Sequence, residues 1–199
     1  MSRDDRPRGG FVVVVGPDGV GKTTVAEALL EGAPPGSGYF HFRPPASGRL
    51  APGPTRESVP VPKYGGEVSR PMGWVRLAVS FGRFWLGYLR VVRPALRAGG
   101  LVVGDRWAYG YIVQPRSLRF GGPEWLARAM VAGLPSPDLV VNLWAPPEVI
   151  VGRKHELTES EVIAELESWS RLAEGIRFDV DARADPETIA ADVRQRALR

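Results

Sequence analysis

The sequence predicts an α/β fold: a five-stranded, mostly parallel sheet with helices on both faces. Short β-branched runs alternate with segments of helical periodicity, a glycine-rich loop follows the first run, and charged residues follow others. Helices between strands carry the chain back across the sheet, so the strands pair in parallel. The expected strands are 11–15, 39–42, 101–105, 138–143 and 177–181, and the expected helices are 24–30, 74–96, 124–132, 146–153, 159–174 and 186–198.

The central strands have the clearest local signal. The runs at 11–15, 101–105 and 138–143 are almost continuously apolar, as expected for strands covered on both faces. The stretches at 39–42 and 177–181 are short and mix apolar with polar residues. We therefore expect the three apolar runs to form the middle of the sheet.

The helices have periodicity and start signals. Residues 74–96 repeat apolar side chains at spacings of three and four, and this favours core packing of their aromatic residues over a base-stacking platform. Proline at 146 suits a first helical turn, and Thr158 with Glu161 predicts a capping box. Four arginines spaced seven apart share one flank of the long helix, a pattern typical of a solvated face, although one or two could turn toward an anion: Arg76, Arg83, Arg90 and Arg97.

Composition and length limit the class of protein. A chain of 199 residues suits one domain spanning 1–199, and 44% hydrophobic with 24% charged residues is typical of globular proteins. No cysteine is present, which excludes disulfides and thiolate metal sites. We expect no signal peptide and no membrane span, and hence a cytoplasmic protein. The net charge of +4 is dispersed among 22 acidic residues, so anionic small molecules are favoured over nucleic acid as partners.

Residues 44–70 form a Pro/Gly-rich insertion. Prolines recur too often here for helix or sheet interior. Such a stretch is either a binding loop or a mobile insertion, and both interpretations remain open.

The segment 16–23 matches the phosphate-binding pattern G-x-x-x-x-G-K-[ST]. A buried strand precedes it and a helix follows, so a glycine turn that binds nothing is the weaker alternative. Its backbone N–H groups would surround the phosphates, Lys22 would reach the β- and γ-phosphates, and the Thr23 hydroxyl would bind Mg²⁺. The expected ATP-binding residues are Gly16, Asp18, Gly19, Val20, Gly21, Lys22, Thr23 and Thr24.

Charged residues also follow other expected strands. Arg43 follows the second, and Asp105 with Arg106 follows the third, so they should meet the glycine loop at one sheet edge. Asp105 offers a carboxylate to a metal or an acceptor hydroxyl, and Arg106 a guanidinium to an acceptor phosphate; a strand-end salt bridge between them is the alternative. Arg153 opens a basic triplet that is either part of a lid at about 153–160 or a solvated helix end.

These motifs occur in an order that resembles the thymidylate kinase family of nucleoside monophosphate kinases. The matching stretches are the loop at 16–24, 42–44, 93–99, 102–107 and 134–140, followed by 147–148 and Arg153. The resemblance implies a P-loop NTPase-type sheet with a helical lid, ATP and Mg²⁺, and Arg106 on the phosphate of the acceptor. It also implies that Asp18 and Asp105 face the acceptor and that Arg153 supplies the transition-state cation. A homodimer is one expected assembly.

The base-recognition elements depart from the family. Its alanine-aspartate-arginine step is replaced by Phe81-Gly82-Arg83, and its serine-rich stretch by residues 108–114. The sequence therefore predicts ATP- and Mg²⁺-dependent phosphoryl transfer to a small-molecule acceptor: a (deoxy)nucleoside monophosphate such as dTMP, a related metabolite, a sugar or a natural product. An accessory nucleotide-binding protein is the alternative. The candidate residues are Lys22, Asp105, Arg106 and Arg153 for catalysis, Thr23 and Asp105 for the metal, and Asp18, Arg43, Arg83, Arg106 and Trp107 for the acceptor.

Overall fold

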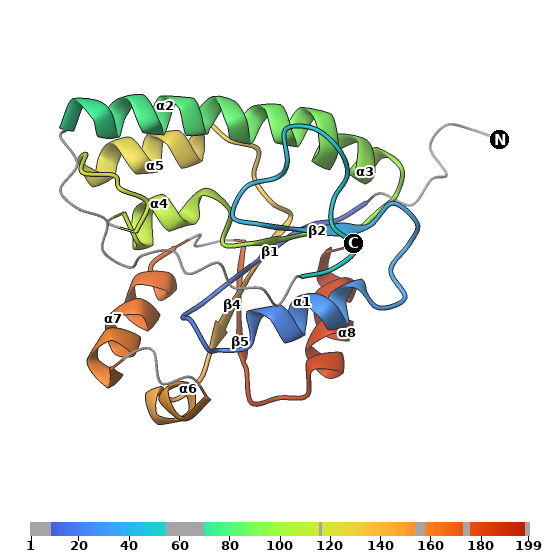
Figure 1. The fold of residues 1–199 in the computed structure, drawn as a ribbon. Coiled ribbons are helices and arrows are strands. Elements are labelled where there is room, and N and C mark those ends of the chain that lie inside the picture. Colours follow the sequence, from blue (N-terminus) through green and yellow to red (C-terminus); the bar gives the residue numbers. More distant parts are fainter. Residues whose placement is uncertain (1–8, 55–69, 116, 154–157, 173–175, 198–199) are drawn as a thin grey trace.

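The protein folds around the five-stranded parallel sheet that the sequence predicts. A computed structural model describes residues 9–54, 70–115, 117–153, 158–172 and 176–197 (Figure 1). The strands are ordered β2-β3-β1-β4-β5, so the first strand of the chain is central. Their bounds are β1 (Phe11–Val15), β2 (Gly38–His41), β3 (Val102–Asp105), β4 (Leu139–Trp144) and β5 (Arg177–Asp181).

The register brings the carboxyl ends of three strands to one edge of the sheet. Val14 pairs with Asp105 of β3, and Asp105 pairs with His41 of β2. The glycine loop leaves β1 one residue after this pairing. The strand ends that carry the sequence-predicted site residues therefore lie side by side.

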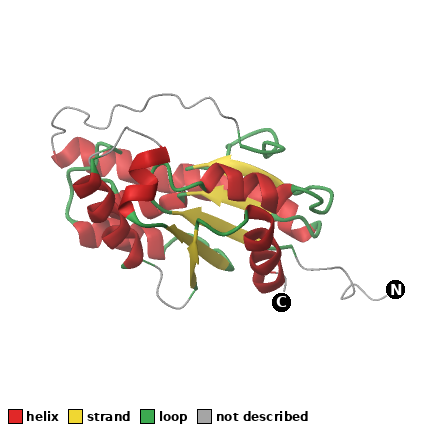
Figure 2. Cartoon of the chain, turned by 90° about the horizontal axis from the view of Figure 1, so that it is seen from below, coloured by secondary structure: helices red, strands yellow, loops and turns green. Residues whose placement is uncertain are grey.

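Helices cover both faces, and β1 shows how the two cores arise. Phe11, Val13 and Val15 point into one buried cluster, whereas Val12 and Val14 point into the other. The first cluster includes side chains of α2 (Arg70–Gly87) and α5 (Glu124–Ala132). The second includes side chains of α1 (Lys22–Leu30), α6 (Pro147–Arg153) and α8 (Pro186–Ala197), and Figures 1 and 2 show the sheet between these two layers.

The long helix expected at 74–96 runs on in one direction, but its hydrogen-bond pattern changes along its length. It begins earlier, at Arg70, and a π-helical turn, η1 (Tyr88–Val92), separates α2 from α3 (Arg93–Arg97). Pro94 has no N–H, and its ring would clash with the carbonyl of residue 90 in a regular α-helix. The N–H of Arg93 instead reaches back to the Tyr88 carbonyl, which is the π-helical spacing.

Other helices differ less from the sequence prediction. The capping box of Thr158 and Glu161 is confirmed at the start of α7 (Glu159–Ser170), which ends earlier than predicted. Two short elements after β3, η2 (Trp107–Tyr109) and α4 (Gly110–Val113), lack a sequence signal because neither completes a period of the apolar pattern. No helix of the described ranges is long and apolar enough to span a membrane.

The first half of the insertion at 44–70 is irregular backbone held against the sheet edge. Ala51 forms an antiparallel bridge with Tyr39, and both of its hydrogen bonds are made, at 2.8 and 3.0 Å. The remainder of the insertion, 55–69, lies outside the described residues.

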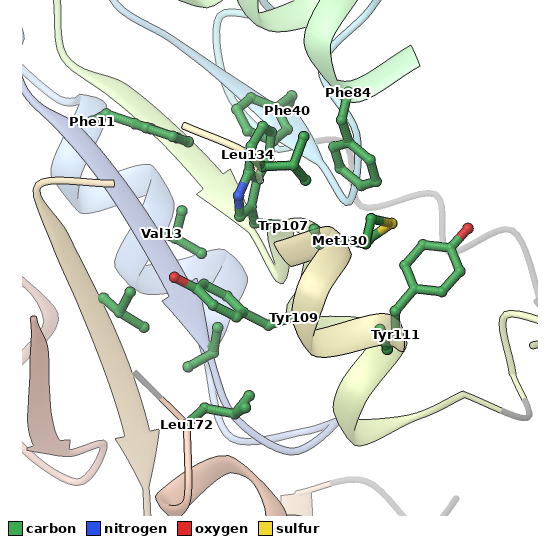
Figure 3. Close-up of a cluster of buried hydrophobic side chains, with 14 of the residues drawn as sticks. Phe11, Val13, Phe40, Phe84, Trp107, Tyr109, Tyr111, Met130, Leu134 and Leu172 are labelled. Atoms are coloured by element: carbon green, nitrogen blue, oxygen red, sulfur yellow. The ribbon is translucent and has the colours of Figure 1, made fainter. Parts of the chain in front are cut away.

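Trp107 lies at the centre of the larger core (Figure 3). Its indole is 1% exposed and makes edge contacts with the rings of Phe11, Phe40 and Phe84 at centroid distances of 5.4, 5.7 and 4.8 Å. Phe84, Trp85 and Tyr88 belong to or pack on this core, as expected, whereas Trp74 is 51% exposed at the first turns of α2.

Candidate active site at the carboxyl edge of the sheet

The glycine loop after β1 has the conformation that phosphate-binding backbone requires. Gly16, Gly19 and Gly21 have φ angles of 138°, 87° and 114°, a region that other residues adopt only with strain. A Cβ atom at Gly16 would lie 2.5 Å from the Leu143 carbonyl oxygen. Helix α1 begins at Lys22, so its N-terminal N–H groups and the positive end of its dipole face the loop.

Lys22 is buried inside this loop. Its ammonium donates hydrogen bonds to the Gly16 and Pro17 carbonyls at 3.0 and 2.7 Å, and lies 3.4 Å from Asp18 Oδ1. Burial and the nearby charge of Arg106 lower the pKa of Lys22, while Asp105 and Asp18 oppose that shift. The cation is therefore positioned among the loop carbonyls, where a phosphate group would complete its surroundings.

Asp18 connects the loop to β3. Its carboxylate pairs with Arg106 as well as with Lys22. Burial alone would raise the pKa of Asp18, but the charges of Lys22 and Arg106 outweigh it and hold that pKa well below its usual range. The same pairing raises the pKa of Arg106 despite its burial. Asp18 therefore stays ionised between two cations.

Asp105 ends β3 with one carboxylate oxygen occupied and the other free. Oδ2 accepts a hydrogen bond from the Tyr39 hydroxyl at 3.3 Å and lies 3.0 Å from His41 Nδ1. Oδ1 is buried and accepts no hydrogen bond from the part of the chain that the structure describes. Burial would raise the pKa of Asp105, yet the contact with His41 and the charge of Lys22 keep it below its usual value. An ionised, half-partnered carboxylate suits a hard cation.

The backbone next to Asp105 is strained. Arg106 and Trp107 have φ angles of 67° and 47°, and Phe42, whose N–H donates to the Asp105 carbonyl at 2.8 Å, has 57°. Each such residue costs about 1–3 kcal/mol, and such strain clusters at functional sites. Here the turn points the Arg106 side chain toward Asp18 while the Trp107 indole enters the core.

Glu165 of α7 and Gln114 after α4 were not anticipated as site residues. Glu165 accepts a hydrogen bond from the Asp18 N–H at 3.4 Å and another from the Gln114 amide at 2.8 Å. Burial and the Asp18 charge raise the pKa of Glu165. Nothing in the sequence separates Glu165 from the other glutamates of its helix, because the contact joins residues 147 positions apart. For Gln114, its place at the end of the stretch that departs from the family pattern was a usable signal.

Arg153, at the end of α6, contacts the glycine loop at Val20. Its guanidinium donates to the Val20 carbonyl at 3.0 Å and to the Ala182 carbonyl, just after β5, at 3.3 Å. The remainder of the triplet, Lys154 and His155, lies outside the described residues, as does half of the predicted lid. Thr23 is partly exposed in the first turn of α1, and Thr24 beside it is exposed.

The acceptor-binding candidates do not all meet. Arg43 and Arg83 line one small cavity beside the end of β2. Asp18 and Arg106 pair at the neighbouring strand ends. Trp107 differs from the sequence prediction, because its indole is enclosed by core rings and presents no surface to a ligand. We therefore exclude the Trp107 side chain from the acceptor-binding set.

Comparison with solved structures identifies the fold as one like that of thymidylate kinase. No protein-family model and no curated protein matches the sequence. Among solved structures, the chain is similar to thymidylate kinase from Candida albicans, with a TM-score of 0.61 and 17% identity over 94% of this chain and 90% of that one. Likeness at this identity establishes a thymidylate-kinase-like fold, as the motif order predicted. The activity of the protein is therefore inferred from the residues of the site.

Proposed function

We propose that this protein is an ATP- and Mg²⁺-dependent kinase that transfers the γ-phosphoryl group to a phosphorylated small-molecule acceptor. The observation that carries the proposal is the Asp18 bridge, which joins the Lys22 cation of the glycine loop to Arg106 after β3. Donor and acceptor phosphates would thus be held within one network of charges. A (deoxy)nucleoside monophosphate or a related phosphorylated metabolite is the acceptor class we expect.

The loop residues would bind and orient the donor. Phosphoryl transfer depends mainly on in-line positioning and charge stabilisation, with little covalent work for the protein. The N–H groups from Gly19 to Thr24 would surround the phosphates of ATP, and Lys22 would exchange the Gly16 and Pro17 carbonyls for phosphate oxygens. Arg153, already on the Val20 carbonyl, would fix the loop against the strand ends.

The residues present fit a magnesium ion. Mg²⁺ is usually held by one or two carboxylates together with phosphate oxygens and water, and no cluster of three or more acidic or histidine side chains occurs in the described ranges. Asp105 Oδ1 is buried without a donor, and Thr23 stands at the head of α1. When bound, the ion supplies charge neutralisation for the transferred group. Because the pKa of Asp105 is held low, this carboxylate suits metal binding better than proton abstraction.

Arg106 would hold the phosphate of the acceptor. A guanidinium presents paired N–H donors that match phosphate oxygens, and its charge is permanent. The Arg106 Nε is buried and donates no hydrogen bond within the part of the chain described here. Arg153 as the transition-state cation remains a prediction, because its guanidinium lies on backbone carbonyls in this structure.

ADP formation with a panel of nucleoside monophosphates and phosphorylated sugars tests this function. We expect acceptor-dependent ADP release by the wild-type protein and its loss in Lys22→Ala, because this substitution removes the cation that lies among the loop carbonyls. The matched control is Arg128→Ala, which removes an exposed cation of α5 that pairs with its helical neighbour Glu124. Its activity should equal that of the wild type.

Two results would contradict the proposal. Near-normal transfer by Lys22→Ala would show that the loop is not the donor site. Tight ATP binding without transfer to any acceptor in a single turnover would favour an accessory nucleotide-binding protein. Circular dichroism and thermal unfolding of both variants establish that the fold is retained.

A further inference from the structure

A small cavity adjoins the candidate site at the end of β2. It has a volume of about 270 Å³. Its apolar wall consists of Phe42, Pro44, Pro45 and Ala46, and the charged side chains that line it among the described residues are Arg43 and Arg83. The cavity begins one residue beyond the strand end, where the Phe42 N–H donates to the Asp105 carbonyl at 2.8 Å. It therefore lies beside the turn that carries Arg106.

The wall of this cavity is firmly built. Helix α2 packs so closely on the chain at Pro44 that a Cβ atom at Gly87 would lie 2.5 Å from the Pro44 carbonyl oxygen. The ring of Phe42 contacts those of Phe84 and Tyr111 at centroid distances of 5.5 and 5.9 Å. The two arginines are thus set on a fixed apolar frame, one from the loop after β2 and one from α2.

Within the described residues, Arg43 packs on aromatic rings and not on a carboxylate. Its guanidinium carbon lies 5.5 Å from the centroid of Phe42 and 5.4 Å from that of Phe84, and its Nε is buried with no acceptor. Burial and the Arg83 charge lower the pKa of Arg43, while Tyr111 opposes the shift. No ion pair joins Arg43 or Arg83 to a carboxylate of the described residues. Arg83 is exposed to solvent, so the partly buried Arg43 guanidinium is the charge that an anion in the cavity would balance most.

The polar side chains of the cavity can only donate hydrogen bonds. Arginine has five N–H donors and no acceptor. The edges of nucleobases present donors as well as acceptors, so arginine side chains alone would pair with only the acceptor atoms of most bases. A carboxylate or a phosphate presents acceptors alone and carries the opposite charge. Hydrogen-bond chemistry therefore favours an anionic group over a base in this cavity.

From these features we infer that the acceptor carries a second anionic group, which Arg43 and Arg83 bind while its phosphate lies on Arg106. The acceptor class is then a phosphorylated compound with a carboxylate or second phosphate at its far end, joined by a short apolar spacer that lies on Phe42 and the prolines. This inference rests on the proposed function, since it describes the acceptor of the same site.

Matched pairs of simple ligands test the inference. The probes are ω-carboxyalkyl phosphates of increasing chain length, each compared by calorimetry with the alkyl phosphate of equal length. At the length that spans both cations, the carboxylate should bind at least about tenfold more tightly, the ratio that one charge-assisted contact of about 1.4 kcal/mol provides. Raising the salt concentration should reduce this advantage, because the cavity is open to solvent.

Arginine variants identify the source of the advantage. It should disappear in Arg43→Gln and in Arg83→Gln and persist in Arg90→Gln, an exposed arginine on the same helical flank. Arg83 is itself exposed, so Arg83→Gln keeps the test valid if Arg43→Gln, which packs on two rings, does not fold.

The outcomes separate this inference from the proposed function. Equal binding of carboxylate and alkyl partners at every length overturns it, as does dTMP that binds more tightly than every carboxylate and depends on Arg83. ADP release, measured on the same samples, tests transfer. A carboxylate advantage that needs Arg83, without ADP release from any acceptor, supports the anion site while contradicting the kinase.

Discussion

The glycine loop and the Arg43–Arg83 cavity lie at neighbouring strand ends, yet they differ in how their charges are balanced. In the loop, every charged side chain has a partner: Lys22 has two carbonyls and a carboxylate, and Asp18 has two cations. In the cavity, two arginines line the same space, and the guanidinium of Arg43 lies over the rings of Phe42 and Phe84. The charges of the glycine loop are therefore paired within the described residues, whereas Arg43 of the cavity has no carboxylate partner there.

This difference teaches where specificity lies. A preorganised loop binds a triphosphate with little rearrangement, and the chemistry of that ligand is common to P-loop proteins. An unbalanced cavity gains the most from the one ligand that supplies the missing charge, and it disfavours ligands that leave its donors unpaired. We therefore expect variants of the acceptor side to change which compound is used, and variants of the donor side to change the rate with all of them.

Arg106→Ala should have the largest effect on the acceptor among the single changes outside the loop. It removes a charge-assisted contact of about 1.5–3 kcal/mol, so kcat/KM for a phosphorylated acceptor should fall roughly 10- to 100-fold. The KM for ATP should change little. Steady-state kinetics with each substrate varied in turn measures both.

The control for Arg106 is Arg106→Lys, which keeps the charge and loses the planar pair of donors, so its activity should lie between those of the wild type and Arg106→Ala. If all three proteins use every acceptor equally well, the acceptor has no phosphate at this position.

Arg153→Ala tests the donor side from outside the glycine loop. Loss of its hydrogen bonds to Val20 and Ala182 should raise the KM for ATP by roughly 3- to 10-fold, the value of about 0.5–1.5 kcal/mol for a partly exposed contact. The effect should be equal for all acceptors. Initial rates over a range of ATP concentrations provide the measurement.

A second outcome for Arg153 has its own meaning. If kcat falls steeply while the KM for ATP is unchanged, the guanidinium leaves its carbonyls and stabilises the transition state, as the sequence resemblance implied. Arg183→Ala is the matched control, since this arginine is exposed, lies next to Ala182 in the sequence and pairs with Asp181.

The glycine loop was also more predictable from the sequence than the Arg43–Arg83 cavity. Its residues follow from one local motif between a strand and a helix, and the strand predictions agree with the structure to within a residue or two. The capping box before α7 is likewise local, joining residues three apart. Where a structural feature depends on neighbours in sequence, periodicity and turn chemistry predict it.

The remainder depended on contacts between distant segments. The Trp107 indole turns into the core because Arg106 and Trp107 adopt positive φ angles, which no sequence pattern signals. The π-helical turn at η1 had a visible cause in Pro94, but a kink or a helix end was equally consistent with it. Glu165 reaches Asp18 only because α7 packs against the strand ends.

Glu165→Gln should have the smallest effect of these changes, and that effect is on stability. Glu165 lies beside the glycine loop, where it contacts Asp18 and Gln114. Folding raises the pKa of Glu165 above its usual 4.5, through burial and the Asp18 charge, so the folded protein binds this proton more tightly than the unfolded chain. Its contribution to stability is complete below pH 4.5 and is lost as the pH rises through the raised pKa. Relative to wild type, the free energy of unfolding of Glu165→Gln should therefore increase with pH across that interval.

Urea unfolding at a series of pH values measures this difference. Glu167→Gln, an exposed carboxylate on the same helix, controls for the change in net charge. Asp18 and Asp105 titrate in the opposite sense: their pKa values lie below 3.8, so they stabilise the fold above that pH and lose this contribution as the pH falls further. If the free energy of unfolding of Glu165→Gln relative to wild type does not change above pH 4.5, folding does not raise the pKa of Glu165. In that case α7 would contact the loop, but the charge of Asp18 would not affect proton binding by Glu165.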